Sequence, residues 1–392
     1  MIPGSLSIIS AVFSKEEKGK AIGTWSAATT IVTICGPVLG GALADAGLWR
    51  LIFFINLPLG LLSIVALQLK VPESKQPKVS AIDWWGAVLL VLSLSALTFG
   101  FLEMPELGYQ HWVVITSLIL GTFFMALFVI VERKVDEPMV PLTMFKNLTF
   151  SGVNLLSFFL YAGMGAVMLF LSLNIIQVQG YSQLQAGLTF LPFSIIMVLA
   201  ARKMGELTSK YGARRFLILG PTVTGLGCVW FTFIGMTDGP SAYWTTYFPP
   251  FLVFALGVSI TVVPLTTAVM ACVDDSKSGI ASGINNSVTR ISGTFINAIL
   301  GAIVILIFGS FVQESLQGMQ VSASITNEVM DEATKLGEAV ASKDYSKELQ
   351  ASVNRIFDLS FINVYQIVCW ISAGLAFLSA AIAYFMVEGK KV

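Results

Sequence analysis

Residues 36–60 read GPVLGGALADAGLWRLIFFINLPLG, and this stretch joins two strongly apolar segments through a short turn. Small residues recur in it every four positions, at Gly36, Gly40 and Ala44. Residues with this spacing share one helix face, on which another backbone can approach closely. The candidate residues for helix packing in this segment are Gly36, Pro37, Gly40 and Gly41. On these residues alone, ordinary packing between two membrane helices explains the pattern.

The composition of the whole chain agrees with a lipid environment. Of its 392 residues, 55% are hydrophobic and 12% are charged, and the mean hydropathy is +0.80, whereas soluble domains are about 25% charged. Basic and acidic residues cancel, so no global field favours nucleic acid. One histidine and four unpaired-looking cysteines offer neither a metal site nor a disulfide framework. We therefore expect an all-α polytopic membrane protein with the lipid bilayer as partner, and no cofactor, metal or nucleic acid.

Apolar runs along the chain predict about 10–11 transmembrane helices. They lie near 1–13, 22–44, 51–70, 84–102, 111–131, 151–176, 184–201, 216–236, 244–272, 279–312 and 360–387. The first run is too short to span, because at ~1.5 Å per residue it covers about 20 Å of a hydrocarbon layer ~30 Å thick. We therefore expect that upstream residues are missing from this sequence.

The distribution of Lys and Arg predicts the orientation, because cytoplasmic loops carry the excess of basic residues. Seventeen of the 23 bases fall in alternate connections and the C-terminal tail, five fall in the other connections, and Arg290 is ambiguous. We expect the protein in the cell membrane with its C-terminus cytoplasmic and the segment 313–359 outside. That segment holds eight acids and four bases. Two helical repeats in it, Val329 to Val340 and Tyr345 to Ile356, favour a solvated cap of short amphipathic helices, with a cation-collecting vestibule as the alternative.

Several motifs in order carry a resemblance to a known family. After GPVLGG come Trp49 and Arg50, then Asn56 and Pro58 inside the next run. Together these resemble the antiporter motif of the fifth helix, and the start of the sixth, in the fourteen-helix drug:proton antiporters of the major facilitator superfamily. Further similar segments are DWWGAVLL from Asp83, VQGYSQLQAGLTFLPF from Val178, PLTTAVM from Pro264 and GIASGINNSVTRISG from Gly279.

The resemblance implies a major facilitator-type fold of two helical bundles, with the first three helices lacking. It divides the chain into 1–70, the remainder of the N-terminal bundle; 71–150, two central extra helices; and 151–392, the C-terminal bundle with the outer segment 313–359. The segment GELTSKYGARR is similar to the cytoplasmic gate loop of the superfamily, through Gly205, Lys210, Gly212 and Arg214. It departs at Ser209, where the family usually has aspartate, and a basic cytoplasmic turn is the alternative interpretation.

Polar stripes along three runs are candidates to line a cavity, because uncompensated polar groups in hydrocarbon are costly. The candidates are Asn154, Tyr161, Asn174, Gln177, Thr261, Asn286, Arg290 and Asn297. Met and aromatic residues beside these amides suit large lipophilic substrates. The alternatives are that such stripes are helix core, and that Arg290 snorkels to the cytoplasmic interface.

The resemblance implies proton-coupled efflux of hydrophobic or amphipathic drugs by alternating access, with a small lipophilic substrate and protons as partners. No Asp or Glu lies in the middle of a run, and Asp83 and Glu103 sit at run ends. In the family the coupling acid commonly lies in the first helix, which this sequence lacks. The alternatives are a non-transporting truncated or structural membrane protein and a transporter of another small solute. An enzyme is not expected, because no nucleophile with a base or phosphate-binding loop is found.

Overall fold

The computed structural model describes residues 32, 35–70, 83–136, 138–273, 278–319 and 321–389. The short first run and most of the 22–44 run lie outside these residues. The described part is helical throughout and contains no strand, which confirms the predicted all-α class. After a helix over residues 35–45, the elements are α3 (Leu51–Phe54), α4 (Asn56–Lys70), α5 (Trp84–Leu107), α6 (Trp112–Lys134), η1 (Leu142–Lys146), α7 (Leu148–Leu173), the π-helix η2 (Asn174–Val178), α8 (Gln183–Thr189), α9 (Leu191–Tyr211), α10 (Ala213–Phe231), η3 (Gly239–Ala242), α11 (Phe248–Ala271), α12 (Ser278–Gln317), α13 (Ala323–Ala333), η5 (Leu336–Glu338) and α14 (Lys347–Met386).

Short polar residues set several helix starts. The side chains of Asp83 and Asn147 accept hydrogen bonds from the first turns of α5 and α7, and Ser182 forms a capping box with Gln185 at α8. Gly108 and Gly212 end α5 and α9 with φ of 84° and 81°, a backbone conformation that L side chains rarely adopt. The turns between spans are therefore encoded locally.

Eight helices of the described chain are long and apolar enough to cross a membrane. The spans predicted at 84–102, 111–131 and 151–176 correspond to α5, α6 and the continuous stretch of α7 and η2. The protein is therefore a multi-pass membrane protein, as expected. Helix α10 covers most of the predicted 216–236 run but is not among the eight, and it begins with Arg214 and Arg215.

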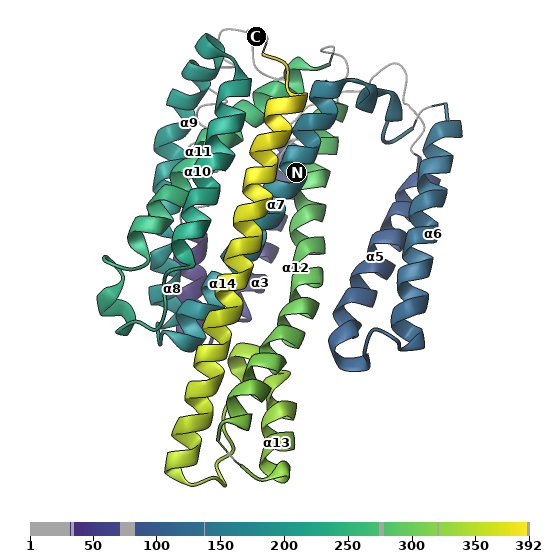
Figure 1. Cartoon of the computed structure of the whole chain (residues 1–392). Helices are drawn as coiled ribbons and strands as arrows, with labels where there is room; N and C mark the ends of the chain where they lie inside the picture. The colour runs from purple at the N-terminus through teal and green to yellow at the C-terminus, as the bar shows by residue number, and fades with distance from the viewer. Residues whose placement is uncertain are drawn as a thin grey trace.

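Long helices run between two ends of the molecule (Figure 1). We call the end with the chain terminus marked C the C-terminal side, and the end with α13 the α13 side. Helices α7, α10, α11, α12 and α14 pack into one bundle with an apolar cluster toward each end. The cluster on the α13 side contains Phe308 and Phe357, and the one on the C-terminal side contains Phe150 and Leu217. Burial of such side chains stabilises the bundle by about 25 cal/mol per Å² removed from solvent.

Helices α12 and α14 are longer than a bilayer needs. Each has 40 residues, about 60 Å of helix against a hydrocarbon layer of ~30 Å. Their excess length, together with α13, forms a projection at the α13 side (Figure 1). The predicted repeat from Tyr345 to Ile356 is therefore not a separate surface helix, because it continues in phase with the last span as the first turns of α14. The other predicted helix ends at Ala333, and Val340 is exposed.

Helices α5 and α6 form an antiparallel hairpin beside the bundle (Figure 1). Glycines make its contact close: a Cβ at Gly121 would stand 2.6 Å from Leu97 Cγ, and one at Gly100 would stand 2.9 Å from Leu118 Cδ2. The Ser93 hydroxyl donates to the Gly121 carbonyl at 2.8 Å. The hairpin meets the bundle at α12, where the rings of Phe101 and Phe295 pack edge to face.

Candidate functional site

The helix over 35–45 meets α8 at a contact between backbones. A Cβ at Gly41 would contact the Gln183 carbonyl and stand 2.9 Å from Leu184 Cα. On the other side, a Cβ at Gly187 would contact the Pro37 carbonyl oxygen. Glycine at positions 41 and 187 therefore allows the helix over 35–45 to contact α8 in the second half of the chain.

Asp45, at the end of the same helix, completes this junction. Its carboxylate accepts hydrogen bonds from the backbone N–H groups of Gln183 and Leu184 at 2.8 and 2.9 Å, and from the Ser182 hydroxyl at 2.8 Å. A carboxylate at a helix start satisfies otherwise unpaired donors. The backbone N–H of Leu184, followed by the Ser182 hydroxyl, lowers the pKa of Asp45 from its ordinary value. We call these contacts, from Pro37 to Asp45 against Ser182 to Gly187, the α8 junction.

The other residues of the antiporter motif lie outside the α8 junction. No described residue comes within 4 Å of a Cβ built at Gly36 or Gly40. The Arg50 guanidinium lies over the Trp49 ring at 4.4 Å. The Asn56 amide donates to carbonyls of its own helical turn, and Pro58 is exposed in α4. Of this predicted set, Pro37 and Gly41 are thus the residues for which the described part of the chain shows a close approach to the second half.

The predicted gate loop lies on the C-terminal side but is mostly helical: residues 205–211 form the last turns of α9, and α10 begins at Ala213. Gly212 makes the turn, and Arg214 follows it, donating to the Tyr384 carbonyl at 2.6 Å and lying 5.4 Å from the Tyr384 ring. Arg214 thus ties the start of α10 to the end of α14. Lys210 lies over the ring of its neighbour Tyr211 at 5.3 Å, and a Cβ at Gly205 would first meet Val263 at 3.9 Å.

Two cavity candidates take part in hydrogen bonds between helices. Buried Asn154 on α7 accepts a hydrogen bond from the Asn285 amide at 3.1 Å, and the same amide donates to the Ser157 hydroxyl at 2.8 Å. Asn174, also buried, accepts from the Tyr247 hydroxyl and from Gln179. These contacts join α7 to α12, and η2 at the end of α7 to Tyr247 at the start of α11.

Three further candidates also pack against neighbouring elements. Thr261 is fully buried and donates to the Gly257 carbonyl, while a Cβ at Gly220 on α10 would contact its hydroxyl. Tyr161 is half-buried against the apolar cluster on the C-terminal side. The Gln177 carbonyl oxygen is buried without a hydrogen-bond partner among the described residues and lies against Gly337.

The remaining candidates lie along α12. Asn286 is exposed and donates to the Ser282 carbonyl one turn back. Arg290 is exposed and lines a hollow of about 230 Å³ between α12 and α5, beside Leu94 and Thr98. Asn297 faces α7 at Gly165, and its buried carbonyl oxygen has no hydrogen-bond partner in the described chain. The eight candidates therefore do not converge on one enclosed cavity in the described residues.

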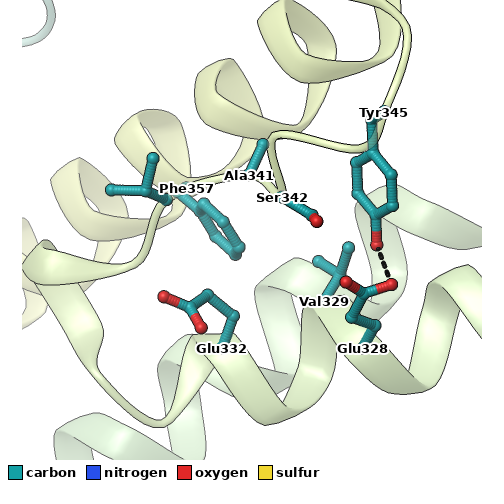
Figure 2. A pocket seen from close by; sticks show the side chains of 8 residues that line it. Glu328, Val329, Glu332, Ala341, Ser342, Tyr345 and Phe357 are labelled. Carbon is teal, nitrogen blue, oxygen red and sulfur yellow. Dashed lines mark hydrogen bonds between the residues drawn. The ribbon is translucent and has the colours of Figure 1, made fainter.

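The acid-rich segment is a packed cap. Val329 and Phe357 are buried beneath a hollow of about 150 Å³, and the Tyr345 hydroxyl donates to the Glu328 carboxylate at 2.8 Å (Figure 2). Burial, and then the hydrogen bond to Glu328, raises the pKa of Tyr345 to about 12. The hydroxyl therefore stays protonated as a donor at neutral pH.

Three residues with specific partners were missed by sequence reasoning. Asp45 carried no local signal, because acids cap the starts of helices, whereas Asp45 ends its own helix and caps the start of α8 instead. Asn285 stands beside Asn286 in an Asn-Asn pair, and spacing by three or four selected Asn286, whereas Asn285 makes the hydrogen bonds to α7. Glu132 directly follows the apolar run at 111–131 and was not singled out, yet it is 3% exposed.

A sequence profile described as Major Facilitator Superfamily matches residues 1–297. The chain belongs to the Major Facilitator Superfamily. This confirms the family identified from the motifs, and the superfamily consists of transporters rather than enzymes.

Similar proteins have names that refer to drug resistance and antibiotics. The chain is 32% identical to "Multidrug resistance protein Stp" of Mycobacterium tuberculosis over 302 residues, which are 76% of this chain and 55% of that protein. It is 28% identical to "Multidrug resistance protein 3" of Bacillus subtilis over 82% of this chain and 62% of that protein. It is 30% identical to the "Probable actinorhodin transporter" of Streptomyces coelicolor over 90% and 61%. The chain thus spans less than two thirds of the length of these relatives.

A solved structure shares the fold. It is that of a bacterial homolog of the human lysosomal transporter Spinster, in an inward-facing and unoccupied conformation. The TM-score is 0.50 at 15% sequence identity, over 98% of this chain and 75% of that one. The likeness agrees with the predicted helical transporter fold.

Proposed function

We propose that the chain is part of a secondary active transporter that exports hydrophobic or amphipathic compounds by alternating access, driven by inward proton flow. The observation that carries the alternating-access proposal is the α8 junction. It joins the glycine segment of the first half to the start of α8 in the second half, on the α13 side. If 313–359 is extracellular, this junction closes the external side.

The chemistry of the junction suits a contact that forms and breaks. It consists of backbone surfaces brought together by glycine and of hydrogen bonds to an exposed carboxylate. Water can satisfy those groups when the contact opens, so separation leaves few uncompensated buried polar groups. Arg214 makes the corresponding tie on the C-terminal side, but within the second half.

We assign three consecutive ranges of the chain to three parts of the transporter. Residues 1–70 belong to the N-terminal bundle, 71–150 supply the two central helices α5 and α6, and 151–392 form the C-terminal bundle with its cap. We assign the substrate class from the drug-resistance relatives and from the aromatic residues and two methionines of α7. The protein then sits in the cell membrane with a cytoplasmic C-terminus.

Export of a fluorescent cation such as ethidium from energised cells tests this function. Cells producing the chain should lose preloaded dye faster than cells with an empty vector, and a protonophore should abolish the difference. Equal loss with and without the chain would refute transport by this chain. Faster loss that ignores the protonophore would refute proton coupling alone.

A further inference from the structure

Two carboxylates meet at the open end of the α5–α6 hairpin, on the C-terminal side (Figure 1). Asp83 caps α5, and its Oδ1 accepts a hydrogen bond from the Gly86 N–H at 2.8 Å. Glu132 lies in the last turn of α6 with 3% of its surface exposed, and its Oε2 accepts from the Val140 N–H at 3.1 Å. One oxygen of each carboxylate is thus committed to a backbone donor.

The second oxygens turn toward the same place. Asp83 Oδ2 and Glu132 Oε1 are both buried, and neither has a hydrogen-bond partner among the described residues. A Cβ at Gly86 would contact Asp83 Oδ2 and would stand 2.9 Å from Glu132 Oε1. The two unpaired oxygens therefore surround the space of one missing methyl group.

No counter-charge compensates the pair in the described structure. Arg133, Lys134 and Asp136 follow Glu132 but are exposed. From α12, Arg290 faces α5 at Leu94, about three turns beyond Asp83. Lys75 and Lys78, which precede Asp83, lie outside the described residues. Two ionised carboxylates whose buried oxygens flank the same small space, with no base beside them, repel each other strongly.

We propose that Asp83 and Glu132 share one proton, which makes the open end of the hairpin a proton-binding site separate from any transport cavity. One protonated oxygen donates to the other carboxylate, so both orphaned oxygens gain a partner. A proton suits the site better than a divalent cation, because Ca²⁺ takes six to eight oxygen ligands. The described chain places no third acid, histidine or cysteine with these two.

The shared proton ties the start of α5 to the last turn of α6, whose Glu132 also holds the segment after α6 through the Val140 N–H. Its loss at high pH would leave two negative charges at one buried point and loosen that tie. The hairpin's open end would then respond to pH. This inference does not depend on the proposed transport function, since it concerns the resting protein without substrate.

Infrared spectroscopy of the purified full chain in lipid nanodiscs tests the proposal. At neutral pH the wild-type protein should show the carbonyl stretch of a protonated carboxylic acid. Glu132→Gln and Asp83→Asn should each lose this band, because the remaining acid no longer has a carboxylate with which to share the proton. Glu106→Gln, which alters an exposed acid at the other end of α5, should keep it.

Absence of the band from the wild-type protein at neutral pH would overturn the proposal whether or not the variants fold. A band that persists in full in Asp83→Asn would also overturn it, because Glu132 would then hold the proton through burial alone. A band that persists in full in Glu132→Gln would overturn the proposal in the same way, because Asp83 would then hold the proton alone.

Discussion

Gly41 tests the α8 junction, because the structure gives an alanine there almost no space. In Gly41→Ala the new methyl group would stand 2.9 Å from both the Gln183 carbonyl carbon and Leu184 Cα, and it would contact the Gln183 oxygen more closely still. All three atoms belong to the backbone, so α8 itself must move. Overpacking of this kind costs about 1–3 kcal/mol. The helix preference for alanine over glycine returns about 0.5–1 kcal/mol.

At the middle of both ranges the net loss is about 1.2 kcal/mol, which shifts the balance between closed and open junction by roughly eightfold. Gly40→Ala is the matched control, since the adjacent position has open space and should gain only helix preference. Dye export from cells, corrected for the amount of protein in the membrane, should fall severalfold in Gly41→Ala and stay near wild type in Gly40→Ala. Equal export by the two variants would refute the reasoning.

Other contacts give further tests. Asn285→Ala leaves the buried Asn154 on α7 without its partner and should lower the free energy of unfolding by about 1–3 kcal/mol. Asn286→Ala should change that free energy by no more than about 0.5 kcal/mol. Similar shifts in melting temperature for the two purified variants would contradict this difference. Because hydrogen bonding lowers the pKa of Asp45, the junction should be unaffected from neutral pH down to the ordinary carboxyl value of 3.8 and should weaken only as the pH falls through the lowered value. Amide hydrogen exchange at the start of α8 measures the strength of the junction at each pH, with Asp45→Asn as the comparison. Weaker protection from exchange at pH 5 than at neutral pH would contradict the prediction. Gly212→Ala should cost about 1–3 kcal/mol because φ is 81° and ψ is 154° there, and an unchanged melting temperature would contradict the assigned turn.

Much of the helical architecture could be predicted from hydropathy, because the bilayer demands long apolar helices. The runs at 84–102 and 111–131 predicted both ends of α6 and the start of α5 to within three residues, and the end of α5 to within five. The start of α14 could not be found this way. Hydropathy detects only the part of a helix that lies in lipid, whereas α14 continues through an amphipathic segment that packs on α13.

The contacts of individual glycines and polar residues were harder to predict than the helices. The four-residue spacing selected Gly36, Gly40 and Ala44 as a face for close backbone approach, whereas the backbone of α8 comes close at Gly41, which that spacing does not include. The same holds for Glu132, which follows an apolar run and which no sequence pattern selected. Its burial depends on Gly86 and on the turn after α6, which no local pattern describes.

A reversible cross-link across the α8 junction tests alternating access most directly. Asp45 and Ser182 have side chains in hydrogen-bond contact, so Asp45→Cys with Ser182→Cys, in a chain whose exposed Cys35 is replaced by serine, should form a disulfide on oxidation. The account predicts that the oxidised protein does not export dye and that reduction restores export. Full export by the oxidised, cross-linked protein would contradict it.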